Sequence, residues 1–286
     1  MKPQLILVEG LPGSGKSTVA QLVQEVLQEM NIPNQLVLEG DLDHPADYDG
    51  TAFYSVEQYE QLIHEQPQYA DLLQAYSLQR EDGVLVFYRK LKNQAGNAFP
   101  DDLVNQIFEH DIYELLLHQN RRLITEKWQH FADQAAPEEK TWVFECCFMQ
   151  NPITIGKVLY AASDAAVTSY VNQLARIVEP LHPLLIYVEQ EDVGRSFRKA
   201  ADERPQEWLN GFLNYYTQYG IGKEMNAAGI DGTIQVLEVR KQLELQIYDQ
   251  LTMNKVKLDN TQVDREAARS QIQSILERFL NEERTS

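Results

Sequence analysis

The sequence is poor in cysteine, histidine and positive charge. Its 286 residues include 2 cysteines, 6 histidines, and 25 lysines and arginines against 43 acidic residues, for a formal net charge of -18. Two cysteines, adjacent at 146 and 147, exclude a disulfide framework and suit a reducing compartment. Six scattered histidines do not suggest a zinc site. Polynucleotides and anionic membranes bind proteins that carry an excess of positive charge, and this chain has the opposite balance. We therefore expect no nucleic-acid and no membrane partner.

Long apolar runs are also missing. No run approaches the length of a membrane span, and Glu9 with the glycine loop that follows interrupts the first apolar stretch, unlike a signal peptide. We therefore expect a cytoplasmic protein. The length allows one large α/β domain or two smaller ones. The oligomeric state stays open, a homodimer included.

What the sequence does contain is a glycine-rich loop between an apolar run and an amphipathic helix. Residues 10–17, GLPGSGKS, match G-x-x-x-x-G-K-[ST] and follow the β-type run 5–8. Glycines allow backbone angles that a Cβ would block, so successive amides and the helix N-terminus form a cradle for an anion. In that cradle Lys16 reaches the outer phosphates of a nucleotide, and the Ser17 hydroxyl ligates Mg²⁺. The alternative interpretation is a simple turn before a helix.

At these residues the chain resembles the P-loop kinases, which phosphorylate nucleotides, nucleosides and small metabolites; residues 12–18, PGSGKST, are the type of loop that they carry. The resemblance implies a three-layer α/β domain with a parallel sheet of about five strands, and ATP and Mg²⁺ as cofactors. Apolar runs place the strands at 5–8, 35–38, 141–145, 184–188 and 255–260. The nucleotide-binding residues are then Gly10, Gly13, Ser14, Gly15, Lys16, Ser17 and Thr18.

Carboxylates follow two of these strands. Asp41 and Asp43 come after the second, where several P-loop kinases carry an acid that holds or deprotonates the acceptor hydroxyl. A solvated acidic turn, with Asp capping a helix near Ser55, is the alternative. Glu145 ends the third strand and is expected to hold Mg²⁺ or to orient the acceptor. Which of the three carboxylates serves the acceptor, and which the metal, stays open.

A cluster of basic residues follows the fourth strand. Arg195, Arg198, Lys199 and Arg204 lie within ten residues of a chain otherwise poor in positive charge. P-loop kinases commonly place a lid here, near 190–205, whose arginines neutralise the transferring phosphoryl group. We expect Arg198 and Arg204 to act in catalysis and Arg195 to bind the nucleotide. The alternative is a basic helix paired with neighbouring acids.

The stretch 50–138 is too long for an ordinary crossover between strands two and three. Helices are predicted over 54–63, 69–78, 101–108 and 112–131, and residues 83–89 are either a short strand or a buried helix. The resemblance suggests that this mostly helical insertion binds the acceptor, and that residues 1–49 and 139–286 form the kinase-like core.

These patterns predict an ATP-dependent kinase that transfers the γ-phosphoryl group to a small-molecule acceptor. The acceptor is either a nucleoside or nucleotide, or a hydroxylated or amine-bearing metabolite or antibiotic. The second hypothesis is a P-loop ATPase or switch module that acts on a partner protein. ATP is not distinguished from GTP by these residues.

Overall fold

The chain forms two compact units in the computed structural model, which describes residues 2–262 and 264–281. One unit comprises residues 1–39 and 128–286, and the other residues 40–127. The sequence prediction places these boundaries after residues 49 and 138. Each unit has a hydrophobic core of its own. Among the described residues, no helix combines the length and apolar character needed to cross a bilayer.

The first unit is built on a sheet of five parallel strands. In space their order is β2-β6-β1-β7-β8, so β1 is the central strand. Ile6 of β1 lies opposite Val143 of β6 on one side and Leu184 of β7 on the other. The strands are β1 (Leu5–Glu9), β2 (Asn34–Val37), β6 (Thr141–Glu145), β7 (Leu184–Glu189) and β8 (Asn254–Asp259). The predicted α/β fold class with a parallel sheet is confirmed.

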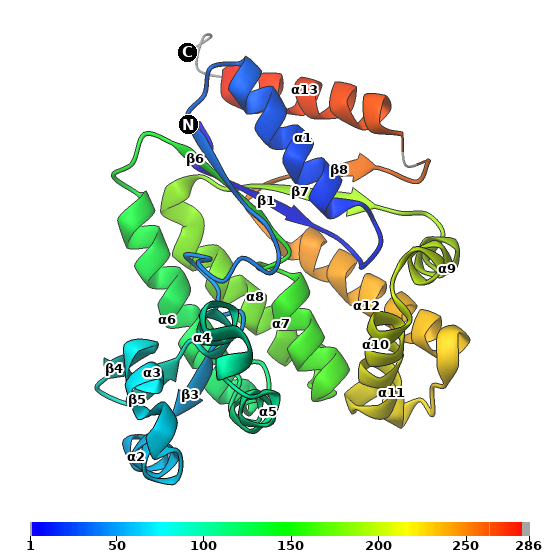
Figure 1. The fold of residues 1–286 in the computed structure, drawn as a ribbon. Coiled ribbons are helices and arrows are strands. Elements are labelled where there is room, and N and C mark those ends of the chain that lie inside the picture. Colours follow the sequence, from blue (N-terminus) through cyan, green and yellow to red (C-terminus); the bar gives the residue numbers. More distant parts are fainter. Residues whose placement is uncertain (1, 263, 282–286) are drawn as a thin grey trace. The chain divides into compact units, whose positions relative to one another are not determined.

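Both faces of this sheet are covered, which explains why its central strands are apolar throughout. Alternate residues point to opposite faces. Ile6 and Val143 pack with the apolar stripe of α1 (Lys16–Glu29) and with α13 (Arg265–Asn281). These two helices lie side by side on one face, and α7, α8 and α12 lie on the other (Figure 1).

The helices of that second face belong to the series that follows β6. This series is α7 (Gln150–Ile153), a π-helix (Thr154–Leu159), α8 (Asp164–Val178), α9 (Val193–Glu203), α10 (Gln206–Gln218), α11 (Gly220–Glu224) and α12 (Gly229–Gln250). The chain breaks between the π-helix and α8, because Ala161 has a left-handed φ of 49° and Ser163 caps the new helix. Gly220 and Gly229 begin α11 and α12.

The second unit contains a three-stranded antiparallel sheet, of which the sequence analysis offers only the short strand within 83–89, here β5. Its strands β3 (Ala52–Tyr54), β5 (Gly83–Val86) and β4 (Ser77–Arg80) are neighbours in that order. The helix expected over 69–78 is therefore wrong at its end, because α3 stops at Ala75. The helices are α2 (Val56–Glu65), α3 (Ala70–Ala75), α4 (Tyr88–Ala95) and α5 (Asp101–Phe108), with short 3₁₀ turns at Pro67–Tyr69 and Gly96–Ala98.

Helix α6 (Leu117–Ala135) runs from one unit into the other. It starts later than the predicted residue 112, because Ile112 N–H donates to the Thr51 carbonyl at 2.9 Å and holds that segment extended beside β3. Within the first unit, the ring of Trp128 lies 5.9 Å from that of Phe144 in β6 and anchors the helix end to the sheet.

Candidate functional site

The phosphate loop joins the central strand β1 to helix α1, and its shape depends on glycine. Gly10 has a φ of 149°, and a Cβ there would lie 2.6 Å from the Val188 carbonyl oxygen. Gly15 has a φ of 90°, and its Cβ would meet Asn260 Nδ2 at 2.5 Å. Because of the positive φ and the close neighbours, any other residue at either position would force the surrounding atoms to move. The loop is therefore held open by its glycines, as the motif predicts.

Two buried amides brace the loop from neighbouring strand ends. Asn260 Nδ2 and Gln190 Nε2 donate to the Ser14 carbonyl oxygen at 2.8 and 3.2 Å. Gln190 also donates to the Asn260 carbonyl at 2.6 Å and accepts from Ser196 Oγ at 2.9 Å. The loop motif carries no signal for Gln190, because the contact joins segments that are far apart in the sequence.

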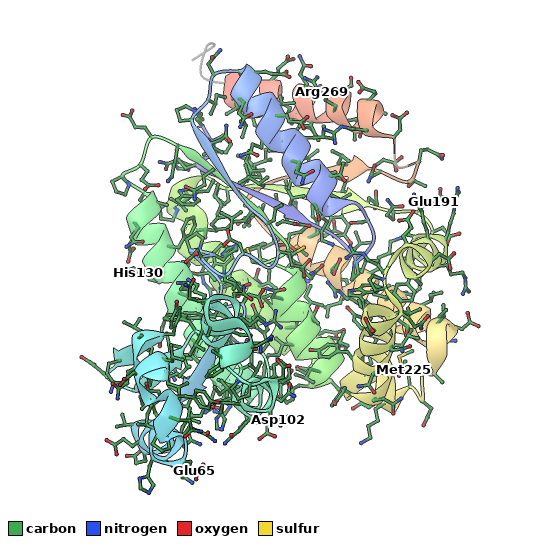
Figure 2. The ribbon with its side chains drawn as sticks, viewed as in Figure 1. Glu65, Asp102, His130, Glu191, Met225 and Arg269 are labelled. Carbon is green, nitrogen blue, oxygen red and sulfur yellow. The ribbon has the colours of Figure 1, made fainter. Side chains whose placement is uncertain are left out.

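A pocket of about 730 Å³ opens at this loop and at the N-terminus of α1. It lies at the carboxyl edge of the parallel strands, where ligands bind in such sheets. Glu191, labelled in Figure 2, lies on its border between β7 and α9. Of the predicted site residues, the pocket is lined by Gly13, Gly15, Lys16, Ser17, Thr18, Glu145, Arg195 and Arg204. Gly10 and Ser14 shape the loop from behind.

Lys16 is the buried cation of the pocket, with 5% of its surface exposed. Its Nζ donates to the Leu11 carbonyl at 2.9 Å, within the loop. Burial opposes the charge, but the nearby carboxylates of Glu39 and Glu145 favour it, and the pKa of Lys16 is raised. The ammonium therefore stays protonated and is available to an anion.

Ser17 and Glu145, the two predicted metal ligands, are in direct contact. Ser17 Oγ donates to Glu145 Oε1 at 2.5 Å, and Glu145 Oε2 accepts from the Glu39 N–H at 3.3 Å. One ligand atom each of Glu39, Glu145 and Cys146 lies within 4.8 Å of the others. Burial raises the pKa of the Cys146 thiol well above its usual range, so it stays neutral. The atoms of this cluster that could hold a metal are therefore the hydroxyl and carboxylate oxygens, which are the ligand type that Mg²⁺ prefers.

Glu9 is buried directly behind the loop. Its two carboxyl oxygens accept from the Phe148 and Gln150 backbone N–H groups at 2.7 and 2.9 Å. Burial raises its pKa to about 7, although these N–H groups and Lys16 act in the opposite direction. Glu9 thereby couples the end of β1 to the segment that follows Glu145.

The predicted lid residues lie on helix α9, except Arg204, which directly follows it. Asp192 caps it by accepting from the Arg195 N–H at 2.8 Å. Arg195 and Arg204 line the pocket together with Lys199, which the sequence groups with them. Arg198 instead donates to Asp231 at 2.8 Å, is 54% exposed, and is not among the lining residues.

The predicted carboxylates after β2 belong to the second unit. Asp41 Oδ1 accepts from the Asp43 N–H at 2.9 Å, and Asp43 pairs with Lys90. Their place at the loop stays a prediction. Glu39, which lies just before them in the sequence and belongs to the first unit, lies beside Glu145. The sequence analysis does not select Glu39.

No family model and no curated protein matches the chain. Among solved structures, a thymidylate kinase from Candida albicans is similar over 98% of this chain and 93% of that chain, at 14% sequence identity and a TM-score of 0.43. A similarity this distant does not indicate an activity.

Proposed function

We propose that the protein is an ATP-dependent phosphotransferase that moves a γ-phosphoryl group to a small-molecule acceptor. The observation that carries the proposal is the 2.5 Å contact between Ser17 Oγ and Glu145 Oε1 at the mouth of the glycine loop. It places the hydroxyl of the loop motif and a strand-end carboxylate together, as a magnesium nucleotide requires. A glycine-rich turn that binds no ligand would not require the contact between Ser17 and Glu145.

The phosphates lie in the cradle of loop amides, with Lys16 at their outer end. Ser17 and Glu145 hold Mg²⁺, which when bound neutralises charge on the phosphate oxygens. The chain's own contribution is to position these groups before the nucleotide arrives, since Asn260 and Gln190 already brace the loop. Preorganised donors stabilise developing charge without further rearrangement.

Positive charge on the other side of the pocket comes from α9 and the turn after it. We propose that Arg195 binds the nucleotide and that Arg204 faces the transferring group, with Lys199 beside them. Arg198 joins them if it exchanges its exposed partner Asp231 for a phosphate oxygen; an exposed ion pair contributes little, so the exchange costs little. This arrangement makes α9 the lid of the site.

A carboxylate is needed to orient the acceptor oxygen. Asp41 and Asp43 keep that proposed role, and Glu39 joins them because its carboxylate lies beside Glu145. The insertion, residues 50–138, is proposed to contribute to acceptor binding.

Acceptor-dependent ADP formation tests the function. The full-length chain is incubated with Mg²⁺ and ATP or GTP, alone and with nucleosides, nucleotides and aminoglycosides in turn. Stimulation by one acceptor, with its phosphorylated product, supports the kinase. Steady hydrolysis that no acceptor changes indicates the P-loop ATPase or switch instead.

Lys16→Ala is the decisive variant of this assay. We expect turnover to fall by about a hundredfold or more, as when a donor to developing charge is removed. The melting temperature should stay nearly unchanged, because the ammonium serves the ligand. Lys223→Ala, at an exposed lysine of α11, is the control and should keep full turnover. Undiminished turnover in Lys16→Ala contradicts the assigned site.

A further inference from the structure

The cations that follow β7 have different kinds of partner. Arg198 pairs with the carboxylate of Asp231. Arg204 belongs to no ion pair among the described residues, and its guanidinium carbon lies 5.3 Å from the centre of the Trp208 ring. A guanidinium at this distance is attracted by the negative face of an indole. An aromatic ring therefore takes the place of a carboxylate beside Arg204.

A ring and a carboxylate leave different parts of a guanidinium available. A carboxylate binds the N–H groups at the edge of the plane and compensates the charge. A ring instead supports the face of the plane, so the N–H groups at the edge stay available and the charge is not neutralised. Phosphate oxygens bind these same edge donors, often two at a time. Arg204 thus keeps the atoms that recognise a phosphate while its side chain has a partner.

The backbone between Arg204 and Trp208 has few conformations. A residue that precedes proline is restricted to extended angles, and Arg204, which precedes Pro205, has a φ of -98° and a ψ of 155°. Pro205 is the N-cap of α10, so the helix starts at Gln206 and places Trp208 in its first turn. The arginine and the ring are therefore held four positions apart by a stiff turn.

The ring of Trp208 is itself fixed to the core by the side chains beneath it. It lies 5.0 Å from the ring of Phe212, which stacks on Tyr216 at 4.2 Å with planes 8° apart. The fully buried Phe197 of α9 packs on Phe212 at 5.2 Å. Tyr216 accepts a hydrogen bond of 2.6 Å from Nη1 of the buried Arg240. Trp208 therefore has a fixed position before any ligand arrives.

Of the two partners, only Arg204 reaches the nucleotide pocket. Arg204 lines the pocket at the phosphate loop together with Lys16 and Ser17. Trp208, also a described residue, is not among the residues that line this pocket. A change at Trp208 can therefore affect a phosphate in the pocket through Arg204, and not by a contact of its own.

We propose that Trp208 is a positioning residue of the site: its ring supports the face of the Arg204 guanidinium and directs the edge N–H groups of that arginine to the terminal phosphate of the nucleotide. Such support reduces the freedom that the arginine side chain loses when it binds a phosphate. This inference rests on the proposed phosphotransferase activity, in which Arg204 faces the transferring group, and adds Trp208 to it.

Fluorescence of the free protein tests the contact without any ligand. The chain has three tryptophans, and Trp128 and Trp142 are buried, so acrylamide quenches mainly the half-buried Trp208. Arg204→Ala uncovers one face of the indole and should increase the quenching. The same substitution should change nothing when Trp208 is replaced by phenylalanine.

Calorimetry on the full-length chain with Mg²⁺ tests the role in binding, with ADP and with AMP-PNP, a non-hydrolysable ATP analogue that keeps the third phosphate. Trp208→Leu should weaken AMP-PNP binding by about three- to tenfold, because an unsupported arginine must then be ordered. Trp208→Phe should recover most of this loss, since it keeps an aromatic face. ADP lacks the terminal phosphate, so its Kd should stay within about twofold of the parent value.

A double-mutant cycle separates positioning from packing. If Trp208 acts through Arg204, Trp208→Leu should cause no further loss of AMP-PNP affinity in an Arg204→Ala background, whereas independent effects would add. Tyr219→Leu, at an exposed tyrosine directly after α10, is the control and should bind AMP-PNP as the parent does. All affinities are measured where circular dichroism shows the variant folded.

Parent-like AMP-PNP affinity in Trp208→Leu, additive losses in the cycle, an equal loss for ADP, or quenching unchanged by Arg204→Ala would each overturn the proposal. Failure of the proposed function gives a different result, because these measurements need no transfer. If the cycle shows the coupling and no acceptor is ever phosphorylated, the role of Trp208 stands and the phosphotransferase fails. If an acceptor is phosphorylated and the cycle shows no coupling, the activity stands and this role of Trp208 is wrong.

Discussion

Carboxylates stand at the carboxyl edge of the parallel sheet, and the structure holds each in a different way. Glu145 faces Ser17, and Glu9 is buried against two backbone N–H groups. Glu189 pairs with Lys257 at 3.0 Å, and Asp259 accepts from the Thr261 N–H at 2.9 Å. Hydrogen-bond partners, ion pairs or burial reduce the negative potential of most of these carboxylates, which would favour the approach of the proposed phosphate tail to an edge rich in acids.

Glu9→Gln should change the pH dependence of stability. Burial raises the pKa of Glu9 from 4.5 unfolded to about 7 folded, so the folded state holds the extra proton between these values. Below pH 4.5 this proton contributes up to about 3 kcal/mol to the stability of the parent protein. The contribution is lost as the pH rises from 4.5 through 7. The variant lacks this loss, so its stability relative to the parent should increase between pH 5 and 8.

Urea unfolding of both proteins at several pH values measures this difference. A constant offset reflects the changed hydrogen bonds to Phe148 and Gln150 and leaves the slope intact. Two parallel curves across the window would show that Glu9 ionises equally in the folded and unfolded chain, and the prediction would then be wrong.

Among elements, the phosphate loop depends on the strand ends around it. Asn260, which follows β8, is 7% exposed and donates to the Ser14 carbonyl at 2.8 Å. Gln190, which follows β7, donates to the same oxygen at 3.2 Å. The loop is therefore not shaped by its glycines alone, because two side chains from other elements hold its middle in place.

Asn260→Ala should weaken ADP binding by about tenfold, since one hydrogen bond of the brace is lost and the loop has more conformations to lose on binding. The melting temperature should fall only slightly, because Gln190 still satisfies the Ser14 carbonyl. Asn254→Ala, at the exposed first residue of β8, is the control. Calorimetric titration with ADP and Mg²⁺ measures the affinity of both variants. Equal affinities would show that the hydrogen bond from Asn260 to the loop does not support ADP binding.

At the scale of the whole molecule, the two units have separate cores, and the pocket at the glycine loop draws all of its lining residues from one of them. Damage to the core of residues 40–127 should therefore lower stability without changing the proposed nucleotide site.

Ile107→Ala tests this separation. Ile107 is fully buried in α5, and removing a buried aliphatic side chain of this size costs about 2–5 kcal/mol. Urea unfolding should show that loss, while the Kd for ADP, measured where circular dichroism shows the variant folded, should stay within about twofold of the parent. A tenfold weaker Kd would show that the second unit supports the nucleotide site. Ile272→Ala, in the other core, is the comparison variant.

Local sequence patterns were enough to predict the parallel sheet and the glycine loop. Each strand of the sheet is a short apolar or β-favouring run, and the loop needs glycine and lysine at fixed spacings along one stretch of chain. The same patterns missed β3 and β4. Those strands have three or four residues, and two of the four in β4 are exposed, so no apolar alternation marks them.

Tertiary structure alone decided which distant side chains share a site. Glu39 beside Glu145 and Gln190 against the loop join residues that are more than a hundred positions apart. A sequence displays the chemistry of each side chain, but proximity arises from the crossing of strands and helices. The glycine loop was therefore predictable from its motif, whereas the side chains that other elements bring to it were not.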